Sequence, residues 1–329
     1  MKMTVKKMMV LVALAVSMTA TAVTPLKRLP WLQAGDTIAI LSPGGSVQQK
    51  VVDGGANTLR LWGFTPVAAP HATKDWHGFG GTIEERTADL LWALRTPSIK
   101  AIMPTRGGDG TPHLLCEIPL DTLRRYPKWI IGFSDITALL SAEACAGYQS
   151  IHGSMCEAIA RYNGTDTVSQ AVLGMLTGRL PRYKVERHPL NQKGHARGML
   201  IGGNMSVYGG LAGSDYDFLQ YIDKEDCILF IEDMGESFTR VDRMLHLLQV
   251  RGLLGKLKGI ICGKFTKYTH PDIGYNDMYE MLHQYLQRYP IPVCYDFPVG
   301  HAHLQNFPMM VGATVELTVN DEGTELQFE

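Results

Sequence analysis

The sequence predicts an α/β protein, with a parallel sheet in its N-terminal part and a strand-richer C-terminal part. Over residues 38–146, short apolar runs alternate with segments of helical pattern, which is typical of parallel strands joined by crossover helices. Each apolar run ends in a loop that contains glycine. The composition, 45% hydrophobic and 19% charged over 329 residues, excludes a disordered chain and allows two domains.

The N-terminal part provides the elements of the expected parallel sheet. In chain order they are a strand at Ile38–Leu41, helices at Val51–Trp62 and Thr82–Leu94, strands at Lys100–Met103 and Trp129–Ile131, and a helix at Ile136–Ala146. Thr82 and Glu85 form a capping box at the start of the second helix. The strands are followed by the loops 42–45, 104–110 and 132–135. Because ligands bind at the carboxyl ends of parallel strands, these three loops should converge on one site.

A polar, aperiodic stretch at residues 166–197 is expected to be a linker. It divides an N-terminal domain, residues 30–165, from a C-terminal domain, residues 198–329. The C-terminal elements are expected as strands at Cys227–Ile231, Gly259–Gly263, Val293–Phe297 and Thr314–Val319, with a helix at Val241–Leu248.

Residues 1–22 have the layout of a secretory signal peptide. Lys2, Lys6 and Lys7 precede an apolar run at Met8–Met18, and a small-residue cleavage site follows at Ala20–Ala22. The alternative is an uncleaved anchor, but the run is shorter than the roughly 20 residues that span a bilayer. We therefore expect export, most simply to a periplasm, without stable membrane insertion after cleavage.

Charge and cysteine content exclude several classes of protein. The formal net charge of -1 provides no basic field for nucleic acid. None of the six cysteines forms a C-x-x-C pair, so the common zinc and redox motifs are absent. Cys227 and Cys262 lie in apolar, strand-like runs, which favours free buried thiols over disulfides.

Ser134 is the first candidate catalytic residue because it lies between a strand and a helix. A serine on such a turn projects above the sheet, close to the first backbone amides of the helix, and those donors can stabilise an oxyanion. The alternative is structural: Ser134 or Asp135 could simply cap the helix.

Glu232 and His301 are the other candidates. Glu232 follows a predicted strand, where a carboxylate can orient a histidine, although a cap or a solvated charge would fit as well. His301 follows Gly300 and could act as a general base. His301 and His303 would share one face of a strand, which raises a metal hypothesis, but no third ligand is near in sequence. We expect His303 not to be catalytic, since one histidine suffices as the base.

Six segments, in order, resemble those of the LD-carboxypeptidase family of serine peptidases. They are Gly35–Thr37 with the following strand, Arg106–Gly108, Gly132–Leu139, Gly202–Ser206, Ile231–Asp233 with Val241–Leu245, and Gly300–His301. Each is weak alone, but together they extend from about residue 30 to 316. Asp109, Phe133 and Ser154 depart from the residues that are usual in the family, which bears on substrate preference.

The resemblance implies a fold, a site and an activity. The fold is a flavodoxin-like N-terminal domain with a smaller β-rich C-terminal domain, and the site lies between them. The nucleophile falls on Ser134, the acid on Glu232 and the base on His301, with the backbone amides of Gly108 and Asp135 as oxyanion donors. No metal or organic cofactor is implied.

The implied activity is that of a serine-type L,D-carboxypeptidase that releases terminal D-alanine from murein tetrapeptides. A related amide hydrolase that gives self-immunity to a peptidyl-nucleotide antibiotic is one alternative, and a non-catalytic muropeptide-binding protein is the other. A carboxypeptidase must recognise a free carboxylate. Arg106 is expected to do so, with Arg240 and Arg243 as alternatives, although Arg243 could serve only in an ion pair with Asp242. The sequence leaves the oligomeric state open, a homodimer included.

Overall fold

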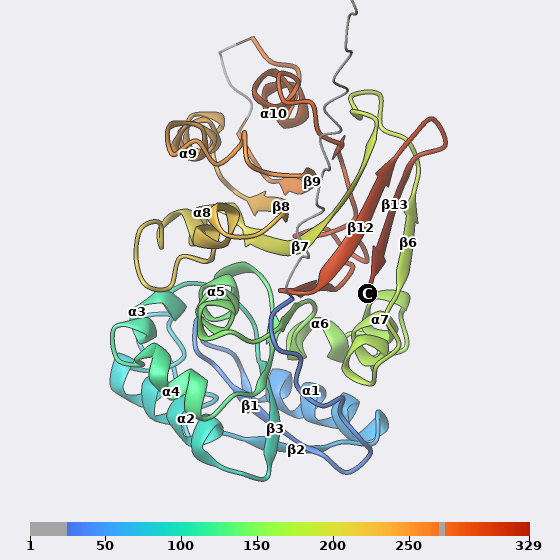
Figure 1. The fold of residues 1–329 in the computed structure, drawn as a ribbon. Helices are drawn as coiled ribbons and strands as arrows, with labels where there is room; N and C mark the ends of the chain where they lie inside the picture. The colour runs from blue at the N-terminus through green and yellow to red at the C-terminus, as the bar shows by residue number, and fades with distance from the viewer. Residues whose placement is uncertain (1–24, 270–273) are drawn as a thin grey trace, which may run out of the picture.

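A computed structural model describes residues 25–269 and 274–329. They form two sheets, of which the first lies in the lower half of Figure 1 among its helices and the second in the upper half. The expected signal peptide, residues 1–22, lies outside the described residues. Within the described ranges, no helix is both long enough and apolar enough to cross a bilayer.

The first sheet has six strands in the order β11-β5-β4-β3-β1-β2. They are β1 (Thr37–Leu41), β2 (Thr65–Ala68), β3 (Ile99–Pro104), β4 (Trp129–Gly132), β5 (Ser150–His152) and β11 (Met309–Val311). β1 to β5 are parallel, and β11 pairs with β5 in the antiparallel sense. The order β2-β1-β3-β4-β5 is that of flavodoxin-like sheets. This confirms the predicted fold class of the N-terminal part.

Helices lie on both sides of this sheet, with α1 and α6 on one side and α2 to α5 on the other (Figure 1). They are α1 (Gln49–Leu61), α2 (Ile83–Arg95), α3 (Thr111–Leu115), α4 (Leu120–Arg125), η1 (Ser134–Ile136), α5 (Thr137–Ala146), α6 (Cys156–Ala160) and α7 (Thr167–Leu176). The predicted capping box is present, since Thr82 accepts a hydrogen bond from the Glu85 amide and Glu85 accepts one in return. The strand Trp129–Gly132 is buried throughout, which explains its uninterrupted apolar pattern.

The second sheet is mixed, with the order β10-β9-β8-β7-β12-β13-β6. Its strands are β6 (Arg182–Val185), β7 (Gly194–Asn204), β8 (Cys227–Met234), β9 (Gly259–Thr266), β10 (Val293–Cys294), β12 (Thr314–Val319) and β13 (Thr324–Phe328). β7 to β10 are parallel, whereas β12, β13 and β6 add in the antiparallel sense. The helices that accompany it are α8 (Met205–Gly209), η2 (Phe218–Asp223), α9 (Phe238–Val250) and α10 (Met278–Leu286).

Residues 166–197 do not form the linker that the sequence suggests. They contain α7, the edge strand β6 and the start of β7. Asp166 caps α7 by accepting hydrogen bonds from the amides of Val168 and Ser169. β6 exposes alternate side chains and buries Tyr183, whose hydroxyl donates to the Pro308 carbonyl. An edge strand with one exposed face looks polar in sequence, which is why this stretch resembles a linker.

Two predicted strands have different ends in the structure. The strand expected at Val293–Phe297 stops at Cys294, because Asp296 adopts a left-handed backbone conformation with φ 59°. The strand expected at Cys227–Ile231 continues to Met234, so Glu232 lies within β8 rather than after it. The pairing of β8 with β9 shifts register between Ile231 and Asp233, beside Glu232. Such irregularities redirect side chains.

The cysteines match the expectation of free thiols. All six are free, and those at positions 156, 227, 262 and 294 are buried. Cys116 is exposed.

Helix α5 joins the two sheets. It packs against α8 and β7 of the second sheet. Thr137 Oγ1, on the first turn of α5, accepts a hydrogen bond of 3.1 Å from the Asn204 amide at the end of β7. A Cβ on Gly203 would lie 2.8 Å from Thr137, so the glycine permits this close approach. Asn204 pairs with Glu232 on β8. The start of α5 is therefore held next to Glu232.

Candidate active site

Ser134 lies on a sharp turn directly after β4. Its φ of 62° is in the left-handed region, which is unusual for a residue other than glycine. Gly132 makes the turn possible, since a Cβ there would lie 2.7 Å from Ile136 Cγ2. Neither η1 nor α5 has a side-chain cap, so the capping alternative does not hold. A serine on a strained strand-to-helix turn is the arrangement of a nucleophile elbow.

Asp135 supports the turn from within. Its side chain is buried, and Oδ2 accepts a hydrogen bond of 2.8 Å from the Thr111 amide. Burial raises the pKa of this carboxyl, while the hydrogen bonds from Thr111 oppose the shift. The same oxygen leaves no room for a Cβ on Gly44, which would lie 2.7 Å away. Asp135 therefore ties the turn to the loops after β1 and β3.

Glu232 and His301 form a buried pair. His301 Nδ1 lies 2.7 Å from Glu232 Oε2, and the two side chains are 10% and 0% exposed. The neighbouring Gly300 has a φ of 118°, and a Cβ there would lie 2.7 Å from Glu232 Oε2. Only glycine lets the chain pass so close to the carboxylate. Complete burial excludes a solvated charge for Glu232, and its place within β8 excludes a helix cap, since Ser237 caps the following helix.

Two opposing influences set the pKa of His301. Burial is the largest single effect and lowers the pKa. The charge of Glu232 and its hydrogen bond act in the other direction, with a smaller contribution from Asp233. The net result is a pKa raised above the ordinary value. The pair thus stabilises a protonated His301, as a general base requires once it has taken up a proton.

Ser134 and His301 line the same cavity, of about 180 Å³. His301 Nε2 is buried and has no hydrogen-bond partner among the described residues. His301 Nε2 therefore makes no hydrogen bond to Ser134 Oγ. Catalytic hydrogen bonds are often long in unliganded sites and shorten when substrate binds. The three residues are brought to one place, although their Ser–His contact is not made in this structure.

The Arg-Gly-Gly loop after β3 passes against the Ser134 turn. A Cβ on Gly107 would lie 2.9 Å from Ser134 Cβ and 3.4 Å from the Asp135 amide nitrogen. Gly107 also accepts a hydrogen bond of 2.8 Å from the Gly45 amide. The three loops thus converge as the sequence predicts. The backbone of Gly108 lines the cavity, which fits its expected role as an oxyanion donor.

Of the three candidate arginines, Arg106 lines this cavity. Its Nε lies 4.0 Å from Glu157 Oε2, and both side chains are about half exposed. Arg240 instead pairs with Glu236. Arg243 is exposed, and its neighbour Asp242 accepts a hydrogen bond from Tyr285 rather than pairing with it.

His303 contacts Arg161 and Tyr162 rather than Glu232. Among the described residues, no three histidine, cysteine or acidic side chains lie close enough together to hold a metal ion.

Asn306 supports the site and has no recognisable sequence pattern. Its Oδ1 accepts a hydrogen bond of 2.9 Å from the Gly300 amide and lies 3.3 Å from His152 Nε2. His152 is fully buried, and burial lowers its pKa to about 4. This neutral histidine and Asn306 fix the loop that carries His301.

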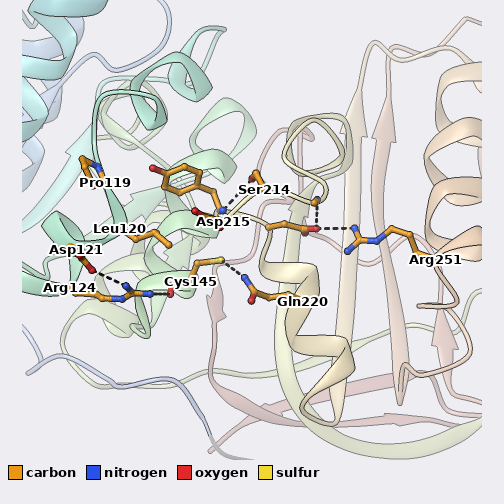
Figure 2. Close-up of a pocket in the computed structure, with 12 residues that line it drawn as sticks. Pro119, Leu120, Asp121, Arg124, Cys145, Ser214, Asp215, Gln220 and Arg251 are labelled. Carbon is orange, nitrogen blue, oxygen red and sulfur yellow. Dashed lines mark hydrogen bonds and ion pairs between the residues drawn. The ribbon is translucent and has the colours of Figure 1, made fainter.

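A larger cavity, of about 660 Å³, lies elsewhere, between α4, α5 and the loop 213–220. The two arginines that line it are bonded to acidic side chains, Arg124 to Asp121 (Figure 2) and Arg251 to Asp217, each over 2.9 Å. None of the candidate catalytic residues lines it. The candidate active site is therefore the smaller cavity beside Ser134.

Comparisons with known proteins give the family of both parts of the chain. The LD-carboxypeptidase N-terminal domain matches residues 38–153, and the LD-carboxypeptidase C-terminal domain matches residues 197–317. A Synechocystis sp. relative named as a carboxypeptidase is 33% identical over 302 residues, which is 91% of this chain and 96% of its own length. The microcin C7 self-immunity protein of Escherichia coli is 28% identical over 312 residues, 85% of this chain and 89% of its own.

The crystal structure of muramoyltetrapeptide carboxypeptidase from Oxalobacter formigenes has the same architecture. It superposes with a TM-score of 0.78 at 27% identity and covers 89% of this chain and 98% of its own. Matches to both domains, relatives of nearly full length and a shared fold lead to one conclusion: the chain belongs to the LD-carboxypeptidase family.

Proposed function

We propose that the protein is a serine-type L,D-carboxypeptidase that releases the terminal D-alanine from murein tetrapeptides. The observation that carries the proposal is the buried Glu232–His301 pair, because His301 lines the same cavity as Ser134 and its Nε2 has no hydrogen-bond partner among the described residues. The similarity to a muramoyltetrapeptide carboxypeptidase supports the choice of substrate. No metal or organic cofactor is required by this chemistry.

The proposed mechanism follows from the hydrogen bonds. Glu232 Oε2 accepts a hydrogen bond from His301 Nδ1–H, which keeps the ring proton on Nδ1 and leaves Nε2 as the basic nitrogen. His301 takes the proton of Ser134 as its oxygen attacks the scissile carbonyl, and the amides of Gly108 and Asp135 stabilise the oxyanion. His301 then gives this proton to the leaving amine of D-alanine. Water hydrolyses the resulting acyl-enzyme by the same route in reverse.

Incubation of the purified protein with murein tetrapeptides, followed by mass analysis, tests the function. We expect each tetrapeptide to lose one alanine over many turnovers. A tetrapeptide that ends in L-alanine is the matched control and should stay intact. Tight binding of the tetrapeptide without any cleavage would instead support a non-catalytic muropeptide-binding protein.

A related amide hydrolase remains the second candidate. The similarity to the microcin C7 self-immunity protein favours it, and a peptidyl-nucleotide antibiotic would then be the substrate. Parallel incubation with such a compound distinguishes the two activities. If the compound is hydrolysed while murein tetrapeptides stay intact, the amide hydrolase becomes the preferred function.

We also propose that the protein is exported, on the basis of the signal-like residues 1–22. The chain isolated from cells is expected to begin near Val23, as N-terminal sequencing would show. Retention of Met1 in a cytosolic fraction would contradict export.

Arg106 is proposed to bind the terminal carboxylate of the substrate. It lines the cavity beside Ser134, and a charge-assisted hydrogen bond would distinguish a chain end from an internal peptide bond. Arg106→Ala should lower kcat/KM about 10- to 100-fold on a tetrapeptide but far less on its C-terminal amide. Steady-state kinetics on the two peptides measure the difference. Equal losses on both would show that Arg106 only supports its loop.

The pH profile should reflect the raised pKa of His301. The base must be neutral, so kcat/KM should rise with pH through a pKa above about 6.5, the ordinary value for histidine. Glu232→Gln removes the charge that raises this pKa and leaves burial to lower it. NMR titration of the His301 ring in that variant should then give a midpoint below the wild-type one. An unchanged midpoint would contradict the assigned pairing.

A further inference from the structure

A second cavity, of about 420 Å³, adjoins the one that contains Ser134. The linings of the two cavities share Phe133, Glu157, Ala158, Met234 and His301, so the cavities adjoin, and together they are called the recess. The mechanism proposed above uses only the smaller part, beside Ser134.

The far end of the recess is lined by Arg161, Tyr162, His303 and Lys267. Arg161 directly follows α6 and reaches His303 Nδ1 over 3.1 Å, and Tyr162 Oη lies 3.2 Å from His303 Nε2. The cluster therefore connects the end of α6 to the loop that carries His301.

The donors in this cluster are fixed by elementary chemistry. Arginine can only donate, so His303 Nδ1 accepts this hydrogen bond, and Nε2 is then the ring nitrogen that donates. Nε2–H donates a hydrogen bond to Tyr162 Oη. The hydroxyl proton of Tyr162 and the other N–H groups of Arg161 then have no partner among the described residues and can bond to a ligand. Such a set of donors suits a carboxylate.

The charges around the recess also favour an anion. Neither Arg161 nor Lys267 forms an ion pair with any described residue. Two acidic side chains line the same cavity. Asp166 is occupied as the cap of α7, and Glu157 lies 4.0 Å from Arg106. Arg161 and Lys267 are thus two cations without an ion-pair partner among the described residues, and neither lines the smaller cavity that contains Ser134.

We propose that Arg161 and Tyr162 bind a second carboxylate of the substrate, and that His303 is the positioning residue that holds them. Lys267, which lines the same cavity, adds to the attraction. The substrate class is then a peptide with an acidic group on the N-terminal side of the scissile bond, besides its free chain end. The inference rests on the proposed peptidase function and adds to it a basis for substrate selection.

Murein tetrapeptides have such a group on glutamate and, in one class, on the diamino acid as well. The test therefore uses three tetrapeptides: one with both carboxylates, one with the glutamate amidated and one with the diamino acid amidated. The quantity measured is the ratio of kcat/KM for the acidic peptide to that for each amide. The amide that lowers kcat/KM identifies which carboxylate is bound.

For the wild type, we expect a ratio of about 10 to 100 on one of the two amides, as for a hydrogen-bonded charge. Arg161→Gln should bring that ratio close to one, chiefly through KM. Tyr162→Phe and His303→Gln should give intermediate ratios. Arg60→Gln, an exposed arginine near the end of α1, is the matched control and should keep the wild-type ratio.

If Arg161→Gln cleaves the peptides with the same ratio of kcat/KM values as the wild type, the inference is overturned and the proposed function stays in place. If the wild type cleaves none of the tetrapeptides, the proposed function fails and the inference fails with it.

Discussion

Ser134→Ala should reduce the release of D-alanine by about 10⁴- to 10⁶-fold, as removal of a serine nucleophile does in other triads. The expectation follows from the left-handed turn that carries Ser134, which lines the same cavity as His301. Release of D-alanine, measured under saturating tetrapeptide, quantifies the loss. Ser98→Ala, an exposed serine before β3, at the opposite end of the strand from the site, is the matched control.

Thermal unfolding distinguishes loss of the nucleophile from loss of the fold. Alanine adds no bulk at position 134, so the unfolding midpoint should change little. A fluorophosphonate probe should label the wild type but not Ser134→Ala, independently of the peptide substrate. Near-normal turnover by Ser134→Ala would refute the triad.

His301→Ala should cause the second large loss, about 10³- to 10⁶-fold in kcat. It removes the base and leaves the fully buried Glu232 carboxylate without its partner. His246→Ala, on an exposed position of α9, is the control that should behave as the wild type. His303→Ala should lose no more than about tenfold, since this residue is proposed to act through substrate binding.

The comparison of the two histidine variants also tests the metal hypothesis. Equal and severe losses in His301→Ala and His303→Ala would point to a shared ligand set. Treatment with a chelator would then decide, because a serine peptidase should keep its activity.

The sequence predicts best those features that depend on local pattern. Runs such as Trp129–Gly132 are buried on both sides, so their continuous apolar character indicates a central parallel strand. The glycine loops could be placed on one edge of the sheet because parallel strands share a direction. The position of Ser134 on a turn can be predicted from the sequence for the same reason, because the strand and the helix on either side define that turn.

Features that depend on contacts between distant segments are harder to predict. Glu232 lies inside β8 rather than after it, and the register shift beside it arises from the pairing with β9. Asn306 acts on Gly300 and His152, and no spacing in the sequence connects it to the latter. The mistaken linker has a similar origin, because β6 becomes a strand only by pairing with β13.

The position of β11 bears on the order in which the protein can fold during synthesis. The chain supplies this strand near its end, yet the strand completes the sheet that contains Ser134. During synthesis, β5 is therefore an open edge until Met309–Val311 emerges. His301 lies on the segment just before β11 and emerges at nearly the same time. The pairing of β11 with β5 and the arrival of His301 thus both come late in synthesis. A nascent or truncated chain that ends before β11 leaves the β5 edge unpaired.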